Sequence, residues 1–257
     1  MSDTTSPVVL VGGVGELYQG DLDLGRVAVE RLAAEDLGRH VLVEDLHYGA
    51  VAVAQRLEEL APPHLVLVGG VARGRPPGSV ERRRVRPPAM TPTELQLSVG
   101  DAVVGYVSID LVVEVACALG ALPVRTVAIE VEPSSTQLSD HLSPYARAAL
   151  DRALELVRDE ARRAPVLDLA GRVAERCRQD ADRIGATPAG RTLLDLLKAI
   201  AVMGDEGRWG RLGALRERLR REIGAGRAAE DLDVGDRALW WALLDELDRL
   251  AAAEASR

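Results

Sequence analysis

The stretch from Val8 to Gly25 constrains the fold of this chain more than any other part of the sequence. It opens with an apolar, β-branched run, Val8 to Val11, which is typical of a buried strand. Glycines at positions 12, 13 and 15 follow and allow a sharp turn where the strand ends. A polar loop then leads into a helix that ends near Asp36, with Asp21 or Asp23 as its predicted N-cap. Because ligands of open α/β sheets bind at the carboxyl ends of strands, we expect the functional site at this loop.

The same alternation of strands and helices continues to residue 163. It predicts a three-layer α/β domain with a mainly parallel, twisted sheet of about five strands between helices. Further strands are predicted at His40–Glu44, Leu65–Val68 and Val124–Val131, with an edge strand at Ser79–Val85, and helices at Ala50–Leu60, at Asp101–Leu119 and from Pro144 to about Arg163.

The remaining residues predict an all-α part. Amphipathic patterns indicate helices at Val166–Ile184, from Pro188, at Leu212–Ile223 and around Trp240 and Trp241. The two indoles are either the core of a helical bundle or a surface for a partner. The predicted domains are therefore an α/β domain at 1–163 and a helical extension at 164–257.

Composition narrows the class of protein. A net charge of −8 over 257 residues argues against a nucleic-acid-binding surface. No apolar run approaches the ~18 residues that span a bilayer, so no membrane partner is expected. The only cysteines, Cys117 and Cys177, form no C-x-x-C motif, which disfavours disulfides and cysteine metal sites and favours a cytoplasmic location. No G-x-S-x-G motif supports a catalytic serine, and the catalytic residues stay unknown.

The glycine-rich loop allows several interpretations. A dinucleotide fingerprint would use Gly13 and Gly15, but its third glycine position holds Tyr18, and the helix begins too late to cradle a phosphate. A flavodoxin-like small-molecule binder is therefore a weak alternative. The glycines are otherwise explained by structure alone.

A family resemblance gives a further interpretation. The order Gly13-Val14-Gly15, Gly20-Asp21 and then Gly25 resembles the amino terminus of the hydrogenase maturation endopeptidases, nickel-recognising proteases that trim the carboxyl-terminal tail of the [NiFe]-hydrogenase large subunit. Weaker matches follow in the family's order, at Asp45, Pro77-Gly78, Gly120 to Pro123, and Leu142-Ser143-Pro144. The resemblance implies a phosphorylase/hydrolase-like fold for residues 1–163, and a hydrogenase large subunit or another maturation factor as partner.

The chain departs from this family at the three nickel ligands. Leu22 replaces the acidic ligand that should follow Asp21, Gly69 replaces the aspartate at the end of the third strand, and residues 101–110 contain no histidine. Leucine and glycine side chains carry no donor atom for nickel. Enzymatic activity is therefore uncertain, and the sequence favours a non-catalytic, chaperone-like maturation factor. An active endopeptidase with a rebuilt metal-recognition site is the alternative.

The rebuilt site would use polar residues near the ends of neighbouring strands. A histidine with several carboxylates suits a divalent metal, and the candidates are Glu16, Asp21, Asp23, Asp45 and His47. Alternatively, Asp21 and Asp23 cap the helix and His47 is a loop residue.

The client-binding hypothesis expects no firm cofactor of the chain itself, and nickel would belong to the client protein. The surface that binds the client would then comprise Glu16, Tyr18, Asp45 and Tyr48, together with the loop at 87–100. Of the other histidines, His64 is expected in a turn and His141 on the surface.

Overall fold

The computed structural model describes residues 7–87, 107–180, 184, 186–224 and 234–256. The chain divides into two compact units, Met1–Ala161 and Arg162–Arg257. Separate clusters of buried hydrophobic residues form the core of each unit. The division falls close to the predicted domain boundary between residues 163 and 164.

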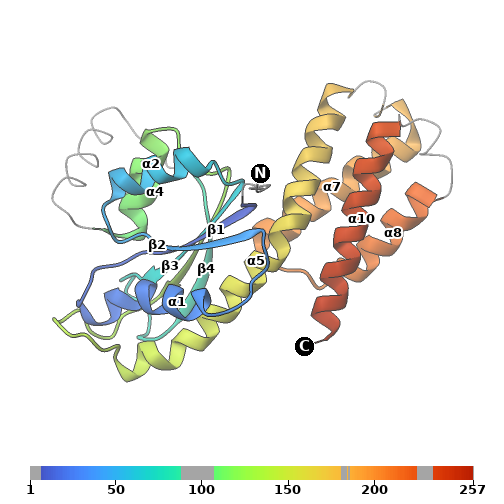
Figure 1. The fold of residues 1–257 in the computed structure, drawn as a ribbon. Coiled ribbons are helices and arrows are strands. Elements are labelled where there is room, and N and C mark those ends of the chain that lie inside the picture. The colour runs from blue at the N-terminus through green and yellow to red at the C-terminus, as the bar shows by residue number, and fades with distance from the viewer. Residues whose placement is uncertain (1–6, 88–106, 181–183, 185, 225–233, 257) are drawn as a thin grey trace. The chain divides into compact units, whose positions relative to one another are not determined.

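The first unit is built on a five-stranded sheet with the order β2-β1-β3-β5-β4 (Figure 1). Four of its strands are parallel, namely β1 (Val9–Gly13), β2 (Val41–Asp45), β3 (His64–Gly70) and β5 (Arg125–Val131). The edge strand β4 (Val80–Val85) pairs antiparallel with β5. The predicted fold class is confirmed, including the segment 124–131 inside the sheet and the charged strand at its edge.

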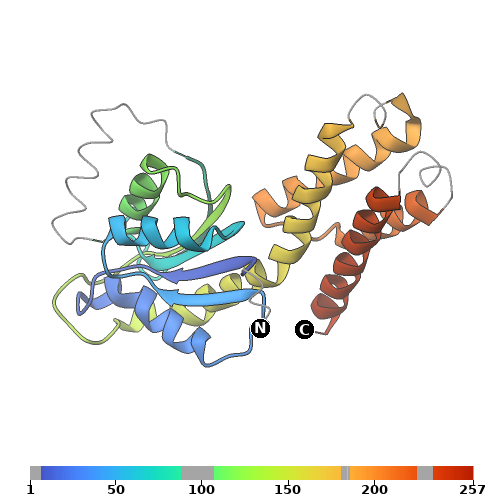
Figure 2. The ribbon, with the colours of Figure 1, turned by 45° about the horizontal axis from the view of Figure 1, so that its top comes forward.

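Helices cover both faces of this sheet. Figures 1 and 2 show α2 (Ala50–Leu60) and α4 (Ile109–Ala118) on one face, and α1 (Leu24–Ala33) with the first part of α5 (Pro144–Gln179) on the other. The central strands are buried on both faces, which explains their nearly continuous apolar sequence. On the second face, Arg158 of α5 donates to Glu35, with Nη2 2.7 Å from Oε1, and this contact lowers the pKa of Glu35.

Two helix boundaries differ from the prediction. Helix α1 ends at Ala33, before the predicted end near Asp36. Helix α4 begins at Ile109, because the Ser108 side chain accepts a hydrogen bond from the Leu111 amide and so caps the helix there. The part of the predicted helix at 101–106 lies outside the described residues.

One long helix replaces two predicted ones. Helix α5 runs from Pro144 to Gln179 and passes through Pro165, where the sequence predicted a break. A proline inside a helix cannot donate to the carbonyl four residues earlier, which here belongs to Ala161. That carbonyl oxygen lies 3.1 Å from His40 Nε2, which can donate to it instead. The lost helical hydrogen bond is therefore compensated from outside the helix.

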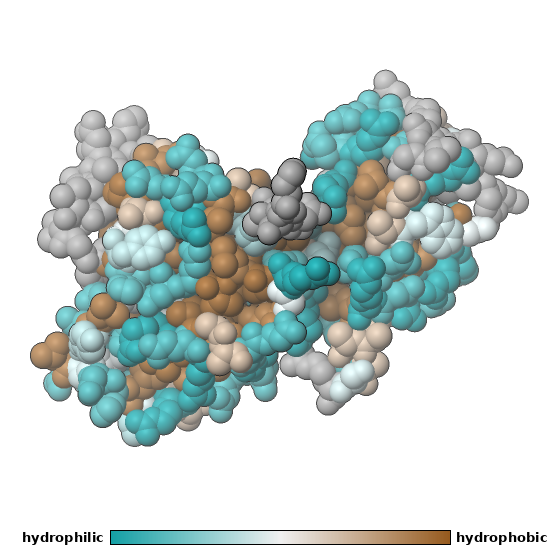
Figure 3. All heavy atoms as spheres, viewed as in Figure 1, coloured by the Kyte–Doolittle hydropathy of each residue, from teal (hydrophilic) through white to brown (hydrophobic). Residues whose placement is uncertain are grey.

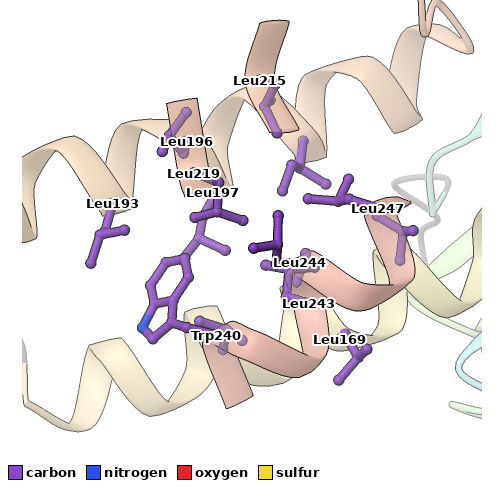
Figure 4. Close-up of a cluster of buried hydrophobic side chains, with 14 of the residues drawn as sticks. Leu169, Leu193, Leu196, Leu197, Leu215, Leu219, Trp240, Leu243, Leu244 and Leu247 are labelled. Carbon is purple, nitrogen blue, oxygen red and sulfur yellow. The ribbon is translucent and has the colours of Figure 1, made fainter. Parts of the chain in front are cut away.

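The second unit is a helical bundle. It comprises the last part of α5 with α7 (Pro188–Glu206), α8 (Leu212–Gly224) and α10 (Val234–Ala255). Figure 4 shows leucines of these helices gathered around Trp240, which is 1% exposed. Trp240 is therefore core, whereas Trp241 is 44% exposed. Trp209, between α7 and α8, is also buried, and the Arg163 guanidinium lies 5.6 Å from its ring centroid.

The surface is largely hydrophilic on the side drawn in Figure 3, with smaller hydrophobic areas between the charged side chains. None of the helices in the described part of the chain is both long and apolar enough to cross a membrane.

Candidate functional site

Two loops lie against each other at the carboxyl edge of the sheet. The loop after β1 and the loop after β5 are joined by backbone hydrogen bonds from Gly20 N to Ser139 O, Asp21 N to Ser135 O and Ser139 N to Tyr18 O. Gly20 and Tyr18 adopt left-handed backbone angles, with φ of 56° and 60°. For tyrosine this conformation is unfavourable and persists only where its surroundings hold it. The hydrogen bonds between the loops supply that constraint.

The carboxylate of Asp21 fastens these loops together. It is fully buried and accepts four hydrogen bonds. Oδ2 accepts from the amides of Ser134 and Ser135 at 2.8 and 3.1 Å and from Ser143 Oγ at 2.8 Å. Oδ1 accepts from the Ser143 amide at 2.6 Å. Both oxygens are occupied by the protein itself, so Asp21 serves as a structural anchor.

Of the two predicted N-cap residues, Asp23 occupies the N-cap position of α1 and Asp21 lies inside the preceding turn of helix. Neither Asp21 nor Asp23 makes a side-chain cap hydrogen bond, because a 3-10 helix, η1 (Gly20–Asp23), directly precedes α1. The Asp23 carboxylate, which is almost buried, instead pairs with Arg26 one turn later, with Oδ2 2.6 Å from Nη2.

The glycines of the first loop serve close backbone packing. A Cβ atom at Gly13 would lie 2.3 Å from the Gly25 carbonyl oxygen, and one at Gly15 would lie 2.0 Å from that of Leu22. Real Cβ atoms do not approach so closely, so only glycine fits at these positions. The backbone of η1 and of the start of α1 fills the space that a phosphate cradle would need. The structural explanation of the glycines is therefore favoured over the dinucleotide fingerprint.

The same packing extends to the end of β3. A Cβ atom at Gly69 would lie 2.3 Å from the Val14 carbonyl oxygen, and one at Gly70 would lie 2.3 Å from that of Asp21. Gly69 stands where the resemblance places a nickel-binding aspartate, and neighbouring backbone fills the place of its side chain. Leu22, at a second ligand position, carries no donor atom. The residues present at these two positions therefore do not fit a nickel ion.

Asp45, the last residue of β2, lies close to His47 in the loop that follows. His47 Nδ1 lies 2.8 Å from Asp45 Oδ2, without the alignment of a hydrogen bond. Within the described residues, His47 Nδ1, Asp45 Oδ1 and Glu16 Oε1 are buried atoms that lack a hydrogen-bond partner. Of the five predicted metal ligands, Asp45 and His47 are thus in direct proximity, while Asp21 and Asp23 are engaged elsewhere.

Within the described residues, no group of three or more His, Cys, Asp or Glu side chains is placed to hold one metal ion. The rebuilt site of Glu16, Asp21, Asp23, Asp45 and His47 has no such group in its support and stays a prediction.

Two aromatic residues of the predicted client surface are exposed. Tyr18 is 58% exposed and Tyr48 is 47% exposed. Tyr48 also contacts the His47 ring edge-on, with centroids 6.4 Å apart. Partial burial and the nearby Glu44 charge raise the pKa of Tyr48. The remaining predicted element of this surface, residues 88–100, lies outside the described residues.

An arginine and carboxylate network borders the site and was missed by the sequence analysis. Glu130 is 1% exposed, and its Oε1 lies 2.8 Å from Arg73 Nη2 and 2.8 Å from Arg83 Nε. Burial alone would raise the pKa of Glu130, but the hydrogen bonds from Arg73 and Arg83 outweigh it, and the pKa is lowered. Arg73 also binds Asp110 on α4. The sequence signal was available in the arginines of 73–84 and in Glu130 and Glu132, which lie on either side of the last residue of β5.

The other two histidines lie in contrasting places. His64 is wrongly predicted as a turn residue, because it is the first residue of β3 and is buried. Burial, followed by the charges of Arg125 and Arg84, lowers the pKa of His64 to about 3. His141 is on the surface, as predicted, beside Asp140.

Among known proteins, only solved structures are found to be similar to this chain. No model of a protein family matches the chain, and no curated protein matches it. One similar structure is a hydrogenase 2 maturation peptidase from Thaumarchaeota archaeon SCGC_AB-539-E09, with 24% identity over 58% of this chain and 94% of the other, at a TM-score of 0.42.

Two further structures are of the same kind. The hydrogenase maturating endopeptidase HybD from E. coli is 21% identical over 58% of this chain and 88% of its own, at a TM-score of 0.42. The [NiFe] hydrogenase maturation protease HybD from Thermococcus kodakarensis is 16% identical over 60% of this chain and 98% of its own, at a TM-score of 0.41. These proteins are of the kind that the sequence motifs resemble. Sequence identities and TM-scores this low do not assign an activity to the chain.

Proposed function

We propose that this protein is a [NiFe]-hydrogenase maturation factor that binds a client of the kind trimmed by the maturation endopeptidases and does not cleave it. The observation that carries the proposal is the packing at two ligand positions. Leu22 has no donor atom, and the Val14 carbonyl oxygen lies 2.3 Å from where a Cβ of residue 69 would be. A cleavage step that depends on nickel recognition has no ligands at these positions.

The client would bind at the carboxyl edge of the sheet, around Glu16, Tyr18, Asp45 and Tyr48. Two exposed tyrosines offer large apolar area with a polar tip, which suits an interface. The carboxylates beside them suit a basic peptide or a basic face of a domain. Asp21 fixes the loop that carries Tyr18, so the surface is formed before the client arrives and little ordering entropy is lost on binding.

The test is capture of a [NiFe]-hydrogenase large subunit, in precursor and in trimmed form, by the immobilised full chain. The mass of the recovered client is measured after incubation with added nickel. We expect capture with no change in mass. Tyr18→Ala combined with Tyr48→Ala should weaken capture, whereas Trp241→Ala, which removes an exposed aromatic of the helical unit, should leave capture unchanged.

Two outcomes contradict this function. Loss of the carboxyl-terminal tail from the precursor would show an active peptidase. Failure to capture either form under conditions where the chain is folded, as judged by circular dichroism, would remove the large subunit as the client.

The unpaired buried atoms of Glu16, Asp45 and His47 favour one second candidate, an active endopeptidase with a rebuilt recognition site. In that case Asp45 and His47 would supply the first two ligands for the client's nickel. Calorimetric titration with nickel separates the candidates. Binding that is tight, one-to-one and lost in His47→Ala would support the rebuilt site, whereas binding that His47→Ala leaves unaltered would exclude it.

A further inference from the structure

The helical unit carries an open groove between α7 and α8, with a volume of ≈ 740 Å³. Its floor is apolar and includes Leu196, Met203 and Leu215. Figure 4 shows Leu196 and Leu215 at the α7 and α8 side of the leucine cluster, away from Trp240. Val202 also lines the groove and is 54% exposed, which is unusual for a valine in a packed bundle.

Cations surround this apolar floor. The basic residues of the lining are Lys198 on α7, Arg208 and Arg211 in and beside the turn, and Arg218 on α8, against Glu206 as the one acidic residue. Such an excess of positive charge is notable in a chain whose net charge is −8. Lys198 is also the only lysine of the sequence.

Within the described residues, three of these four cations make no internal ion pair. Elsewhere in the unit, arginines are paired, as Arg220 is with Asp248 at 2.7 Å. No hydrogen bond or ion pair joins the side chains of Arg208, Arg211 or Arg218 to any of the described residues, and Lys198 has only the exposed Asp195 at 3.5 Å. Positive charge that the fold leaves unpaired beside exposed apolar side chains is available to a partner.

We propose that the groove between α7 and α8 is a docking site for an acidic amphipathic helix of a partner protein. The apolar face of that helix would cover Val202 and the floor, and its carboxylates would pair with the rim of cations. A nucleic acid would satisfy the cations but leave the apolar floor without a counterpart. The site lies wholly in the helical unit and is independent of the client surface on the first unit.

The spacing of the residues along the two helices supports this geometry. Lys198 and Val202 are four positions apart on α7. On α8, Leu215 comes three positions before Arg218, and its amide donates to the carbonyl oxygen of Arg211, the residue just before the helix. Residues at these separations share one face of a helix. Along the groove, Val202 of α7 therefore lies beside Lys198, and Leu215 of α8 lies between Arg211 and Arg218.

The experiment measures fluorescence anisotropy of a labelled synthetic peptide with leucines on one helical face and glutamates on the other, titrated with the full chain. We expect saturable binding that weakens at least about fivefold between about 0.05 M and about 0.5 M salt, because screening acts on the cations. A peptide with lysines in place of the glutamates should bind at least about tenfold more weakly.

Variants locate the site. Arg211→Glu combined with Arg218→Glu should weaken binding at least about tenfold, because two attractive charges become repulsive. Arg221→Glu is the matched control, since Arg221 is an exposed arginine of the same helix that does not line the groove, and it should change affinity less than about twofold. Val202→Asp should also weaken binding, and it is expected to fold because the side chain is largely exposed.

Four outcomes would overturn the proposal. Equal effects of the groove variants and Arg221→Glu would show non-specific attraction. Tighter binding of a single-stranded oligonucleotide than of the peptide would assign the groove to nucleic acid. A dimer in sedimentation that Val202→Asp abolishes would assign it to a second copy. Tighter peptide binding after Glu230, Asp231 and Asp233 are changed to Gln or Asn would assign it to that segment of the chain.

Discussion

Replacement of Asp21 by asparagine tests whether this carboxylate holds the site together. Asparagine keeps the shape of the side chain, and its oxygen can retain the three bonds now made by Oδ2. Its amide group must then face the Ser143 N–H, which is 2.6 Å from Oδ1 in the present structure. Two donors cannot bond to each other, so the substitution leaves a buried donor without a partner.

The expected loss of stability follows from these bonds. A buried polar group left unpaired costs about 1–3 kcal/mol, and the bonds that asparagine would retain are weaker than bonds to a charged acceptor, so the loss should lie at the upper end of that range. We therefore expect Asp21→Asn to lower the unfolding free energy of the first unit by about 3 kcal/mol. For a domain of this size the melting temperature should fall by about 6–12 °C.

The assay can separate the two units, because all three tryptophans, at 209, 240 and 241, lie in the second unit. Far-ultraviolet circular dichroism during thermal unfolding should show the lower melting temperature of the first unit. The melting temperature measured by tryptophan fluorescence, which reports on the second unit, should not change. Asp140→Asn is the matched control, since Asp140 is an exposed aspartate of the adjoining loop, and it should cost less than about 0.5 kcal/mol. Equal effects of the two substitutions would refute the anchoring role of Asp21.

Two further predictions concern closely packed positions of the first unit. The pKa of His64 falls to about 3 in the folded protein, whereas the unfolded chain titrates near 6.5, so the unfolded chain binds more protons below about pH 6.5 and stability should drop by about 2 kcal/mol on going to pH 5. His64→Leu should flatten this dependence in denaturant titrations followed at several pH values, and an unaltered slope would contradict the assignment. Gly70→Ala should destabilise the first unit by about 1–3 kcal/mol, because the new Cβ would lie 2.3 Å from the Asp21 carbonyl oxygen. Gly171→Ala on α5, where nothing lies within 4 Å, should be neutral or stabilising by up to about 1 kcal/mol, and a reversed order of the two would show that the tight packing at Gly70 is not real.

The sequence patterns correctly predicted those strands and helix ends that depend on residues close together in the chain. The β-branched runs predicted the strands of the sheet, and Thr187 with Pro188 predicted the start of α7, where the Thr187 side chain accepts from the Gly190 amide. Helix periodicity likewise predicted the helix that carries Trp240 and Trp241, but it left open whether the two indoles are core or surface. These outcomes depend on residues within a few positions of one another, so a single sequence contains the information.

The functions of the polar residues were harder to predict. Asp21 has the sequence context of an N-cap, yet its partners include Ser143, which is 122 positions further along the chain. His64 follows two prolines and so resembles a turn residue, yet it begins a buried strand beside Arg125. Glu130 is an unremarkable glutamate in a strand until Arg73 and Arg83 are brought to it.

The sequence by itself determined the α/β and helical parts of this protein and the absence of donor atoms at Leu22 and Gly69, because hydrophobic periodicity and side-chain chemistry are properties of the residues themselves. Only the tertiary structure decided that backbone fills the space at Gly69 and that the Asp21 carboxylate accepts its hydrogen bonds from the segment after β5. It also decided that α5 continues through Pro165, where His40 bonds to the carbonyl oxygen that the proline leaves free. Each of these depends on groups far apart in the chain that folding brings within 4 Å. Hydrogen bonding and steric exclusion act at that range, and sequence spacing does not specify which distant groups will meet.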